Sequence, residues 1–596
     1  MRTASAAVLT PVRAQKRLGV HVGVPEFPEV RGFDGAHVGA RSLMYSPDGG
    51  RLAVALEGRC VAQVIEANGS TRIYSVSEEA VSLLHELPIA RAIELAFSPR
   101  GTFLMTWERP VKSENGGWSH NLRVWDAQSG AQVAEFERRQ IDGWALQFTD
   151  KEDYCLRQVA AEIQVYDAHD FARGTVGRLR VENIGTVSLS PGGQPSVAVF
   201  FPERKGAPAF VRIYPLSSTL GAAASAAPPA HAAQKSFFKA DKVTMRWNAA
   251  GSSLLLMTST DHDQTGKSYY GETNLYMLSS RGDFDCRVGL DKEGPIHDFA
   301  WNPNSREFIV IYGYMPAKAV VFSYRVNVIA ELGTQARNFI AYNPQGRLFC
   351  LGGFGNLAGS VDIWDREHLD RGKLFTIDAS GSSVLEWSHD GQFLLTGTLS
   401  PRLRVENGVK IWHCTGQLVH IAMEDEMYAA GWRPQRFTPV PPFPKDLPAA
   451  PKPSAAAAEL LAKKAAMARP VGAYRPPGAR HAGASTGDYL RRNEDSTPSA
   501  TYTPPGAQRR RKVPGVPDAP AQASKPAKPA MGAADVGANS SDGSTVEKKL
   551  RNLTKKLKAI EQLKERRDKG ETLEQTQLQK IDGEADIRRE LEALGA

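Results

Sequence analysis

Short apolar runs alternate with polar turn sequences along roughly the first 440 positions of this 596-residue chain. Nine times an apolar residue, usually aromatic, precedes a turn. The fullest copies are Tyr45-Ser-Pro-Asp-Gly49, Phe97-Ser-Pro-Arg-Gly101 and Trp387-Ser-His-Asp-Gly391, and looser copies begin at Phe148, Leu189, Trp247, Trp301, Tyr342 and Trp432. Proline fixes φ, aspartate bonds its own backbone and glycine accepts positive φ, so each copy suits a turn. Successive starts are 41 to 58 residues apart, a period that indicates a β-propeller.

Each copy of the repeat has a second half. It is an alternating apolar run that ends in an aromatic residue, often followed by aspartate, at 72–74, 122–126, 163–167, 211–214, 275–276, 320–322, 361–365 and 409–412. Such alternation places one side of a strand in a core between sheets. The motif at Trp432 has no second half, and the apolar segment Leu18–Val22 could supply its missing strands and close the ring.

The sequence therefore predicts an all-β, WD-type β-propeller, followed by a disordered linker and a C-terminal α-helical segment. We favour nine blades. Eight is the alternative, because the motifs at Phe148 and Trp432 are degenerate and propellers usually have four to eight. The predicted boundaries are a disordered tail over 1–17, the propeller over 18–440, the linker over 441–543 and the helices over 544–596.

Charge is distributed unevenly between these parts. Residues 441–596 contain 28 Lys+Arg and 19 Asp+Glu, a net charge of +9, which leaves −1 for residues 1–440. A basic tail beside a nearly neutral ring favours contact with nucleic acid or a ribonucleoprotein surface. The alternative is a tail that is charged for solubility alone.

The linker is rich in Pro, Ala, Gly and Ser, and it cannot bury enough apolar surface to offset chain entropy. One pattern recurs within it, Tyr-x-Pro-Pro-Gly-Ala. It suggests a docking peptide in extended form, although low-complexity sequence can also repeat by chance. The candidate docking residues are Tyr474, Pro476, Pro477, Tyr502, Pro504 and Pro505.

The last fifty residues predict two helices. Ser544-Thr-Val-Glu547 forms a capping box, Gly570 is a plausible stop, and Thr572-Leu-Glu-Gln575 opens a second helix. An apolar stripe (Val546, Leu550, Leu553, Leu557 and Ile560) lies opposite basic residues on the first helix, as expected for one half of a helical hairpin. The candidate RNA- and ribosome-binding residues are Lys548, Lys549, Arg551, Lys555, Lys556, Lys558, Arg566 and Lys569. A solvated face over a small coiled coil is the alternative.

Catalytic and metal-binding motifs are not found. Asp263-Gln-Thr-Gly-Lys-Ser268 lacks the first glycine of a phosphate loop, since that position is Asp261, and no strand–helix context surrounds it. The five cysteines are scattered without metal-ligand spacing, so we expect neither a zinc site nor a disulfide framework. No apolar run approaches the length of a membrane span. We predict no enzyme, cofactor or metal, and no membrane partner.

Several longer strings resemble the eukaryotic translation initiation factor 2A family. They include Phe97-Ser-Pro-Arg-Gly-Thr-Phe-Leu-Met-Thr-Trp-Glu108, Lys242-Val-Thr-Met-Arg-Trp-Asn248, Thr265-Gly-Lys-Ser-Tyr-Tyr-Gly271, Gly294-Pro-Ile-His-Asp298, Tyr312-Gly-Tyr-Met-Pro-Ala-Lys318, Gly353-Phe-Gly-Asn-Leu357 and Asn407-Gly-Val-Lys-Ile-Trp-His413. The resemblance covers nearly the whole chain, and the linker departs most from it. The C-terminal Lys555-Lys-Leu-Lys-Ala-Ile-Glu-Gln-Leu563 resembles the terminal helix of that family.

The resemblance implies a cytoplasmic translation initiation factor. It would bind the small (40S) ribosomal subunit and messenger RNA, and recruit initiator methionyl-tRNA without GTP, mainly in non-standard initiation. Other initiation factors are further expected partners, and we expect a monomer. The alternative is a non-ribosomal WD-repeat scaffold with a basic RNA-binding tail.

Three basic residues are candidate contacts on the propeller surface. Arg402 and Arg404 alternate with Leu403 on what the pattern predicts to be a strand or its edge, where their shared face would suit phosphate or carboxylate partners. Pairing with acids of a neighbouring blade is the equal alternative. Lys267 is the third candidate.

Overall fold

The computed structural model describes most of the first 468 residues and a few positions near the C-terminus. The described residues are 9–14, 18–23, 26–30, 40–56, 60–61, 64–65, 70–112, 116–204, 206–221, 229–238, 240–260, 271–400, 402–435, 440–468, 557, 560, 561, 564, 581, 584, 585, 588 and 589. The chain forms two units, Met1–Ala482 and Gly483–Ala596.

Eight four-stranded antiparallel sheets make up most of the first unit, and they follow one another in chain order. Sheet 1 contains β3 (Ala40–Tyr45), β4 (Arg51–Leu56), β7 (Thr71–Val76) and β8 (Val81–Leu87), and sheet 2 contains β9 (Glu94–Phe97), β10 (Phe103–Trp107), β11 (Leu122–Asp126) and β12 (Gln132–Phe136). Sheet 3 contains β13 (Gln147–Phe148), β14 (Tyr154–Val159), β15 (Glu162–Asp167) and β16 (Thr175–Arg180), and sheet 4 contains β17 (Val187–Leu189), β18 (Ser196–Phe201), β19 (Ala209–Pro215) and β20 (Ala233–Phe237).

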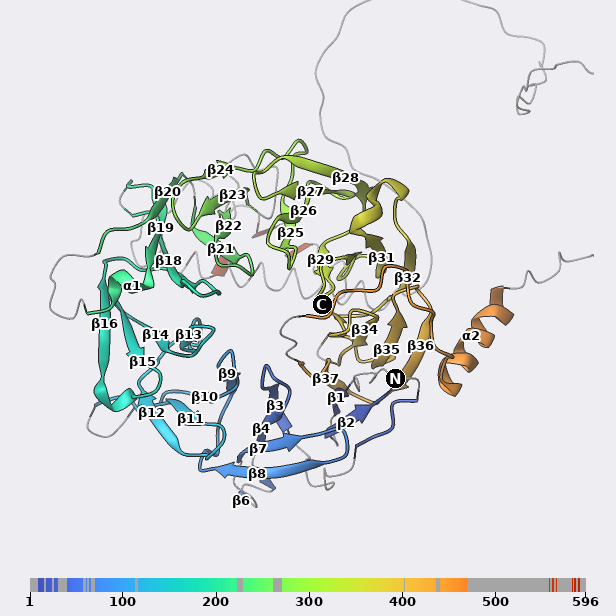
Figure 1. Cartoon of the computed structure of the whole chain (residues 1–596), viewed down its shortest axis with the longest axis horizontal. Coiled ribbons are helices and arrows are strands. Elements are labelled where there is room, and N and C mark those ends of the chain that lie inside the picture. The colour runs from blue at the N-terminus through green and yellow to red at the C-terminus, as the bar shows by residue number, and fades with distance from the viewer. Residues whose placement is uncertain are drawn as a thin grey trace, which may run out of the picture. The chain divides into compact units, whose positions relative to one another are not determined.

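Sheets 5 to 8 repeat the same arrangement. Sheet 5 contains β21 (Lys242–Trp247), β22 (Ser253–Ser259), β23 (Thr273–Ser279) and β24 (Asp285–Arg287), and sheet 6 contains β25 (Ile296–Trp301), β26 (Glu307–Tyr312), β27 (Ala317–Ser323) and β28 (Val328–Gln335). Sheet 7 contains β29 (Phe339–Tyr342), β30 (Leu348–Gly352), β31 (Ser360–Asp365) and β32 (Phe375–Asp378), and sheet 8 contains β33 (Val384–Trp387), β34 (Phe393–Thr398), β35 (Gly408–His413) and β36 (Leu418–Met423). The sheets surround a centre, with the first strand of each sheet innermost (Figure 1). The predicted β-propeller is confirmed.

A ninth sheet of three strands joins the two ends of the ring. Its innermost strand, β37 (Met427–Ala430), pairs with β1 (Leu9–Ala14), which pairs in turn with β2 (Leu18–Val22). The prediction that Leu18–Val22 completes the motif at Trp432 is thus confirmed. The predicted disordered tail over 1–17 is wrong for residues 9–14, because these residues form the strand between β2 and β37.

The repeat seen in the sequence has one structural position. Eight of the nine motif starts are the last residue of the first strand in a sheet, and the eight second halves lie in the third strands. In the first copy, the Ser46 Oγ accepts from the main-chain N of Arg51 at 2.9 Å, and Gly49 has a φ of 71°. The turn chemistry inferred from Ser-Pro-Asp-Gly therefore sets the connection between first and second strands.

Neighbouring sheets are fastened by tryptophans of these motifs. The indole nitrogens of Trp301, Trp387 and Trp432 donate to the carbonyl oxygens of Arg246, Ala341 and Glu386, at 2.9, 3.1 and 3.1 Å. Each acceptor directly precedes the motif of the preceding sheet. These three tryptophans thus join sheets 6, 8 and 9 to the first strands of the sheets that precede them.

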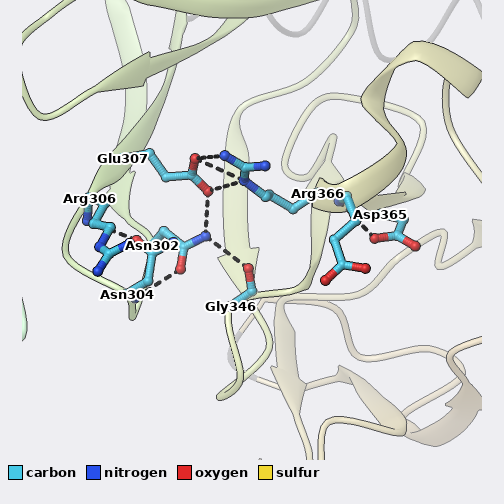
Figure 2. Close-up of polar contacts among 8 residues, drawn as sticks. Asn302, Asn304, Arg306, Glu307, Gly346, Asp365 and Arg366 are labelled. Carbon is cyan, nitrogen blue, oxygen red and sulfur yellow. Dashed lines mark hydrogen bonds and ion pairs between the residues drawn. The ribbon is translucent and has the colours of Figure 1, made fainter. Parts of the chain in front are cut away.

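An ion pair between a buried carboxylate and a partly exposed arginine fastens sheet 6 to sheet 7 (Figure 2). Glu307 begins β26 and is 1% exposed, and its Oε2 accepts from Arg366 Nε and Nη2 at 3.0 and 2.8 Å. Asn302 Nδ2 donates to Glu307 Oε1 and to the carbonyl oxygen of Gly346, both at 2.8 Å. This carboxylate has a structural role, because its described contacts hold two sheets together.

Residues 440–468 pack against sheets 7 and 8, which corrects part of the predicted disordered linker. Phe443, Leu447 and Leu460 contact the apolar core of these sheets. Ser454 donates its main-chain N to the carbonyl oxygen of Val419 at 2.8 Å and precedes α2 (Ala455–Ala468). Alanine has the best helix propensity, so this Ala-rich run forms a helix where composition alone predicted disorder. The remainder of the linker lies outside the described residues.

Short elements complete the described chain. They are the hairpin of β5 (Cys60–Val61) and β6 (Val64–Ile65), the helix α1 (Leu216–Thr219), and the 3-10 helices η1 (Phe171–Arg173) and η3 (Arg366–Arg371). No helix in the described ranges is long and apolar enough to cross a bilayer.

Candidate nucleic-acid interface

The ring has two faces with different connections. Strand direction alternates within each sheet, so the nine motif turns lie on one face together with the links between third and fourth strands. We call this face the turn face. The links between second and third strands, and between one sheet and the next, lie on the opposite face, which we call the entry face. Strings 294–298, 312–318 and 353–357, which resemble the family, all lie at connections of the entry face, and so does segment 402–405.

Exposed apolar side chains also gather in connections of the entry face. They are Val111, Ile141, Phe238, Tyr314, Met315, Leu403 and Val405, with exposed fractions between 40% and 81%. In the described connections of the turn face, Tyr324 is the one large apolar side chain of comparable exposure. Exposed apolar groups indicate a binding surface, and aromatic faces can stack on bases.

Arg402 and Arg404 lie in the connection between β34 and β35, and not on a strand as predicted. The loop folds back because Asn407 Nδ2 donates to the carbonyl oxygen of Leu403 at 2.7 Å and Glu406 adopts a φ of 55°. Both arginines are exposed, and neither forms an ion pair with any residue that the structure describes. Their positive charge is therefore presented on the entry face.

The neighbouring connection of sheet 7 touches this loop. A Cβ added at Gly355 would lie 3.1 Å from Arg402 Nη2, so the guanidinium rests against a residue without a side chain. Beneath this connection, Asp362 is 2% exposed and accepts from Arg337 Nη2 and Thr376 Oγ1, both at 2.6 Å, and from Lys373 Nζ at 3.1 Å. Burial would raise the pKa of Asp362, but these hydrogen bonds lower it below its ordinary range. This charged cluster joins β31 to β32 and to the segment that precedes β29.

Two of three described cavities open on the entry face. One, of about 660 Å³, lies between sheets 5 and 6, and its lining mixes Glu272, Arg287, Asp291, Lys292 and Glu293. The second, of about 540 Å³, lies between sheets 1 and 2, and its lining includes four arginines beside a single carboxylate, Glu108. The third, of about 380 Å³, lies on the turn face.

The second unit is helical at the few positions that the structure describes. Ile560 and Ile581 are 4% and 8% exposed, so the predicted apolar stripe is buried at Ile560. Glu584 forms ion pairs with Lys564 and Arg588, and the first pair links the two predicted helical segments. These contacts agree with two packed helices.

Most of the predicted binding residues lie outside the described residues. These are Lys267, the linker positions Tyr474, Pro476, Pro477, Tyr502, Pro504 and Pro505, and the basic residues Lys548, Lys549, Arg551, Lys555, Lys556, Lys558, Arg566 and Lys569. They remain predictions.

The described part of the chain bears on the predictions for metal ligands and thiols through the grouping and burial of its side chains. Within it, no three His, Cys, Asp or Glu side chains are grouped to hold a metal ion. Four cysteines are free thiols, and burial raises the pKa of Cys350 and of Cys414 to about 12. Such thiols are inert at neutral pH.

Known proteins with similar sequences decide the family. A relative from Schizosaccharomyces pombe, eukaryotic translation initiation factor 2A, is 41% identical, and the match spans 98% of each chain. The chain belongs to the eukaryotic translation initiation factor 2A family. The relative of the same name from Saccharomyces cerevisiae is 33% identical over 86% of this chain and 90% of its own.

Domain-level and structural comparisons agree with this assignment. The family model for eukaryotic translation initiation factor eIF2A matches residues 235–430, and the model for the C-terminal domain of that family matches residues 548–594. A crystal structure of a eukaryotic initiation factor aligns with a TM-score of 0.64 and 38% identity, over 72% of this chain and 99% of that chain. The factor 2A family consists of translation initiation factors and is not an enzyme family.

Sequence reasoning missed two features of the interface, the exposed apolar side chains of the entry face and the basic cavity between sheets 1 and 2. Their residues come from separate connections. The repeat positions would have placed those connections on one face, but they say nothing about side-chain exposure.

Proposed function

We propose that this chain binds the small ribosomal subunit and messenger RNA, and recruits initiator methionyl-tRNA without GTP, mainly in non-standard initiation. The observation that supports the proposal most is the match to a translation initiation factor over 98% of both chains, which includes the propeller and the tail. We place the chain in the cytoplasm, as a monomer, with other initiation factors as additional partners.

Two parts of the chain have separate roles in this proposal. Segment 547–569 contains ten basic and four acidic residues, an excess that suits the phosphates of ribosomal RNA. The entry face combines exposed aromatic and apolar groups with Arg402 and Arg404, and it suits a partner that is recognised by shape, such as folded RNA or a ribosomal protein.

A second candidate is a protein scaffold that does not act on ribosomes. The exposed apolar side chains of the entry face favour it, since such groups also form protein interfaces. In this case the basic tail would bind RNA unrelated to initiation. Sucrose-gradient sedimentation separates the two candidates, because a scaffold of this kind would stay at the top of the gradient.

The direct test is recruitment of labelled initiator methionyl-tRNA to purified small subunits by the full chain. We expect retention that depends on the protein and is equal with GTP, with GDP and without nucleotide. Elongator methionyl-tRNA is the matched control and should be retained less. No protein-dependent retention, or retention that requires GTP, would contradict the proposal.

A further inference from the structure

The cavity between sheets 1 and 2 has an unusual charge. It has a volume of about 540 Å³ and opens on the entry face, and four arginines line it: Arg41, Arg91, Arg109 and Arg123. Glu108 is the one carboxylate among its described lining residues, and Arg123 Nη1 contacts Glu108 Oε2 at 2.6 Å. The lining therefore keeps an excess of positive charge after its own acid is neutralised.

Arg91 and Arg109 account for most of the available charge. Both are exposed, and neither forms an ion pair with a described residue. They approach the cavity from different elements, since Arg91 lies in the connection from β8 to β9 and Arg109 follows β10. Two guanidinium groups at one cavity can together contact one phosphate, or two successive phosphates.

Hydrogen bonds hold other residues that line this cavity in place. Asn121 is 2% exposed, and its Nδ2 donates to the carbonyl oxygens of Glu108 and Arg138 at 2.7 and 2.8 Å. Ser119 Oγ accepts from the main-chain N of Val111 at 3.0 Å. His120 Nδ1 lies 2.9 Å from Glu135 Oε1. These hydrogen bonds fix several of the residues that line the cavity, whereas Arg91 and Arg109 are exposed.

We propose that this cleft binds phosphodiester groups of single-stranded RNA through Arg91 and Arg109. The proposal deepens the proposed function, and rests on it, by naming where the propeller meets RNA. Val111, 61% exposed, lies at the cleft and offers an apolar contact for a ribose or base. Phe238, between sheets 4 and 5, and Tyr314, in sheet 6, are exposed aromatic groups elsewhere on the same face, of the kind on which bases stack. Two exposed guanidinium groups beside an apolar contact favour the successive phosphates and sugars of RNA over the single phosphate of a phosphorylated peptide.

The test compares charge-matched double variants of the full chain. Arg91→Gln with Arg109→Gln removes two charges from the cleft, whereas Arg281→Gln with Arg306→Gln removes two exposed arginines from the turn face. Each pair is made in the natural chain and in a chain whose tail basic residues Lys548, Arg551, Lys555 and Lys558 are changed to Glu, so that binding by the tail does not mask the cleft. Fluorescence anisotropy with an unstructured RNA oligonucleotide gives Kd at two salt concentrations.

We expect the cleft variant to bind RNA about tenfold more weakly. The slope of log affinity against log salt should fall by about 1.4, because each phosphate that the protein no longer neutralises lowers it by about 0.7. The turn-face variant should bind like its parent. Crosslinking of 4-thiouridine RNA should label peptides around 91–93 and 108–123 in the parent, and this label should be absent from the cleft variant.

Equal Kd values and equal salt slopes for the cleft variant and its parent, in both tail backgrounds, would overturn the proposal. Loss of binding to a phosphoserine peptide, with RNA binding unchanged, would also overturn it and would assign the cleft to a phosphoprotein. Because the probe is free RNA, neither result tests tRNA recruitment on ribosomes. That function is tested separately by the retention of labelled initiator methionyl-tRNA on small subunits.

Discussion

Arg433 donates from Nε to the main-chain carbonyl oxygen of Gly49 at 2.6 Å, and so joins positions 384 residues apart. Its Nη2 donates to the carbonyl oxygen of Val76 at 3.1 Å. A Cβ at Gly49 would lie 1.9 Å from the carbonyl oxygen of Pro434, so the closeness of the two chain segments depends on glycine at this turn. The last motif is thus fastened to sheet 1 by direct contacts, in addition to the pairing of β37 with β1.

Deleting residues 1–17 should open the ring. The deletion removes β1 and leaves edges of β2 and β37 unpaired, and unpaired edges promote association between chains. We expect a lower Tm and aggregation on heating, measured by differential scanning calorimetry and light scattering. Deleting residues 1–8 leaves β1 in place and is the control. A 1–17 deletion that melts like the full chain and stays monomeric would show that β1 is not needed for closure.

Glu307→Ala should destabilise the propeller. It removes the carboxylate that accepts from Arg366 and from the buried Asn302, and leaving a buried donor without its acceptor costs about 1–3 kcal/mol. Glu331→Ala is the matched control, because Glu331 pairs with Lys318 at 2.8 Å but is 58% exposed, and such pairs contribute about 0–1 kcal/mol. Urea unfolding measures both. Equal destabilisation in the two variants would contradict a structural role for Glu307.

The propeller should lose stability as the pH falls below neutrality. Burial lowers the pKa of His389 and of His413 below their ordinary value of 6.5, and Asp390 opposes the shift in both. The folded state therefore prefers the neutral rings, whereas the unfolded chain takes up protons as the pH falls through about 6.5. Their contribution is fully present above that pH and declines below it.

His413→Gln should flatten this pH dependence. His413 is 0% exposed, and its Nδ1 lies 2.9 Å from Thr415 Oγ1, a contact that the glutamine side chain could partly replace. We expect the difference in Tm between pH 7.5 and pH 5.5 to be smaller in the variant. An unchanged difference would show that another group controls the acid sensitivity.

Changing Arg402 and Arg404 together to Ala should weaken RNA binding without lowering the Tm. Both side chains are exposed and lack ion pairs to described residues, so their removal disturbs no described packing. Filter binding with ribosomal RNA and thermal melting measure the two effects separately. A lower Tm with intact RNA binding would instead assign the two arginines a structural role.

The fold could be predicted largely because turn chemistry is local. Ser46, Pro47, Asp48 and Gly49 set a turn that any matching sequence would form, and the repeated spacing then implies sheets around a ring. Closure could be inferred in part, since the apolar pattern reveals β2, whereas β1 reads as part of a tail. Its segment Leu9–Ala14 is short and contains Pro11, and its pairing partner Met427–Ala430 is far away in sequence.

The interface could be predicted less well, because it depends on side chains from separate connections. The sequence indicates that Arg402 and Arg404 are surface residues, but the strand predicted for them is a loop that Asn407 and Glu406 shape. Arg91 and Arg109 lie on different connections and share no local motif, and nothing in their neighbours along the chain indicates a common cavity. Similarly, composition does not reveal that Leu460 of α2 packs against sheets 7 and 8.

The most direct test of the account is cosedimentation with small ribosomal subunits of the full chain and of a variant in which Lys548, Arg551, Lys555 and Lys558 are changed to Glu. These residues recur at spacings of three and four, so one helical face would follow a line of phosphates. We expect much weaker binding by the variant and a slope of log affinity against log salt that is shallower by about 3, or about 0.7–0.9 for each phosphate, with an unchanged Tm of the propeller. Changing Glu561 and Glu565 to Lys should not weaken binding. Cosedimentation of the four-Glu variant equal to that of the natural chain, at low and at moderate salt, would contradict the account.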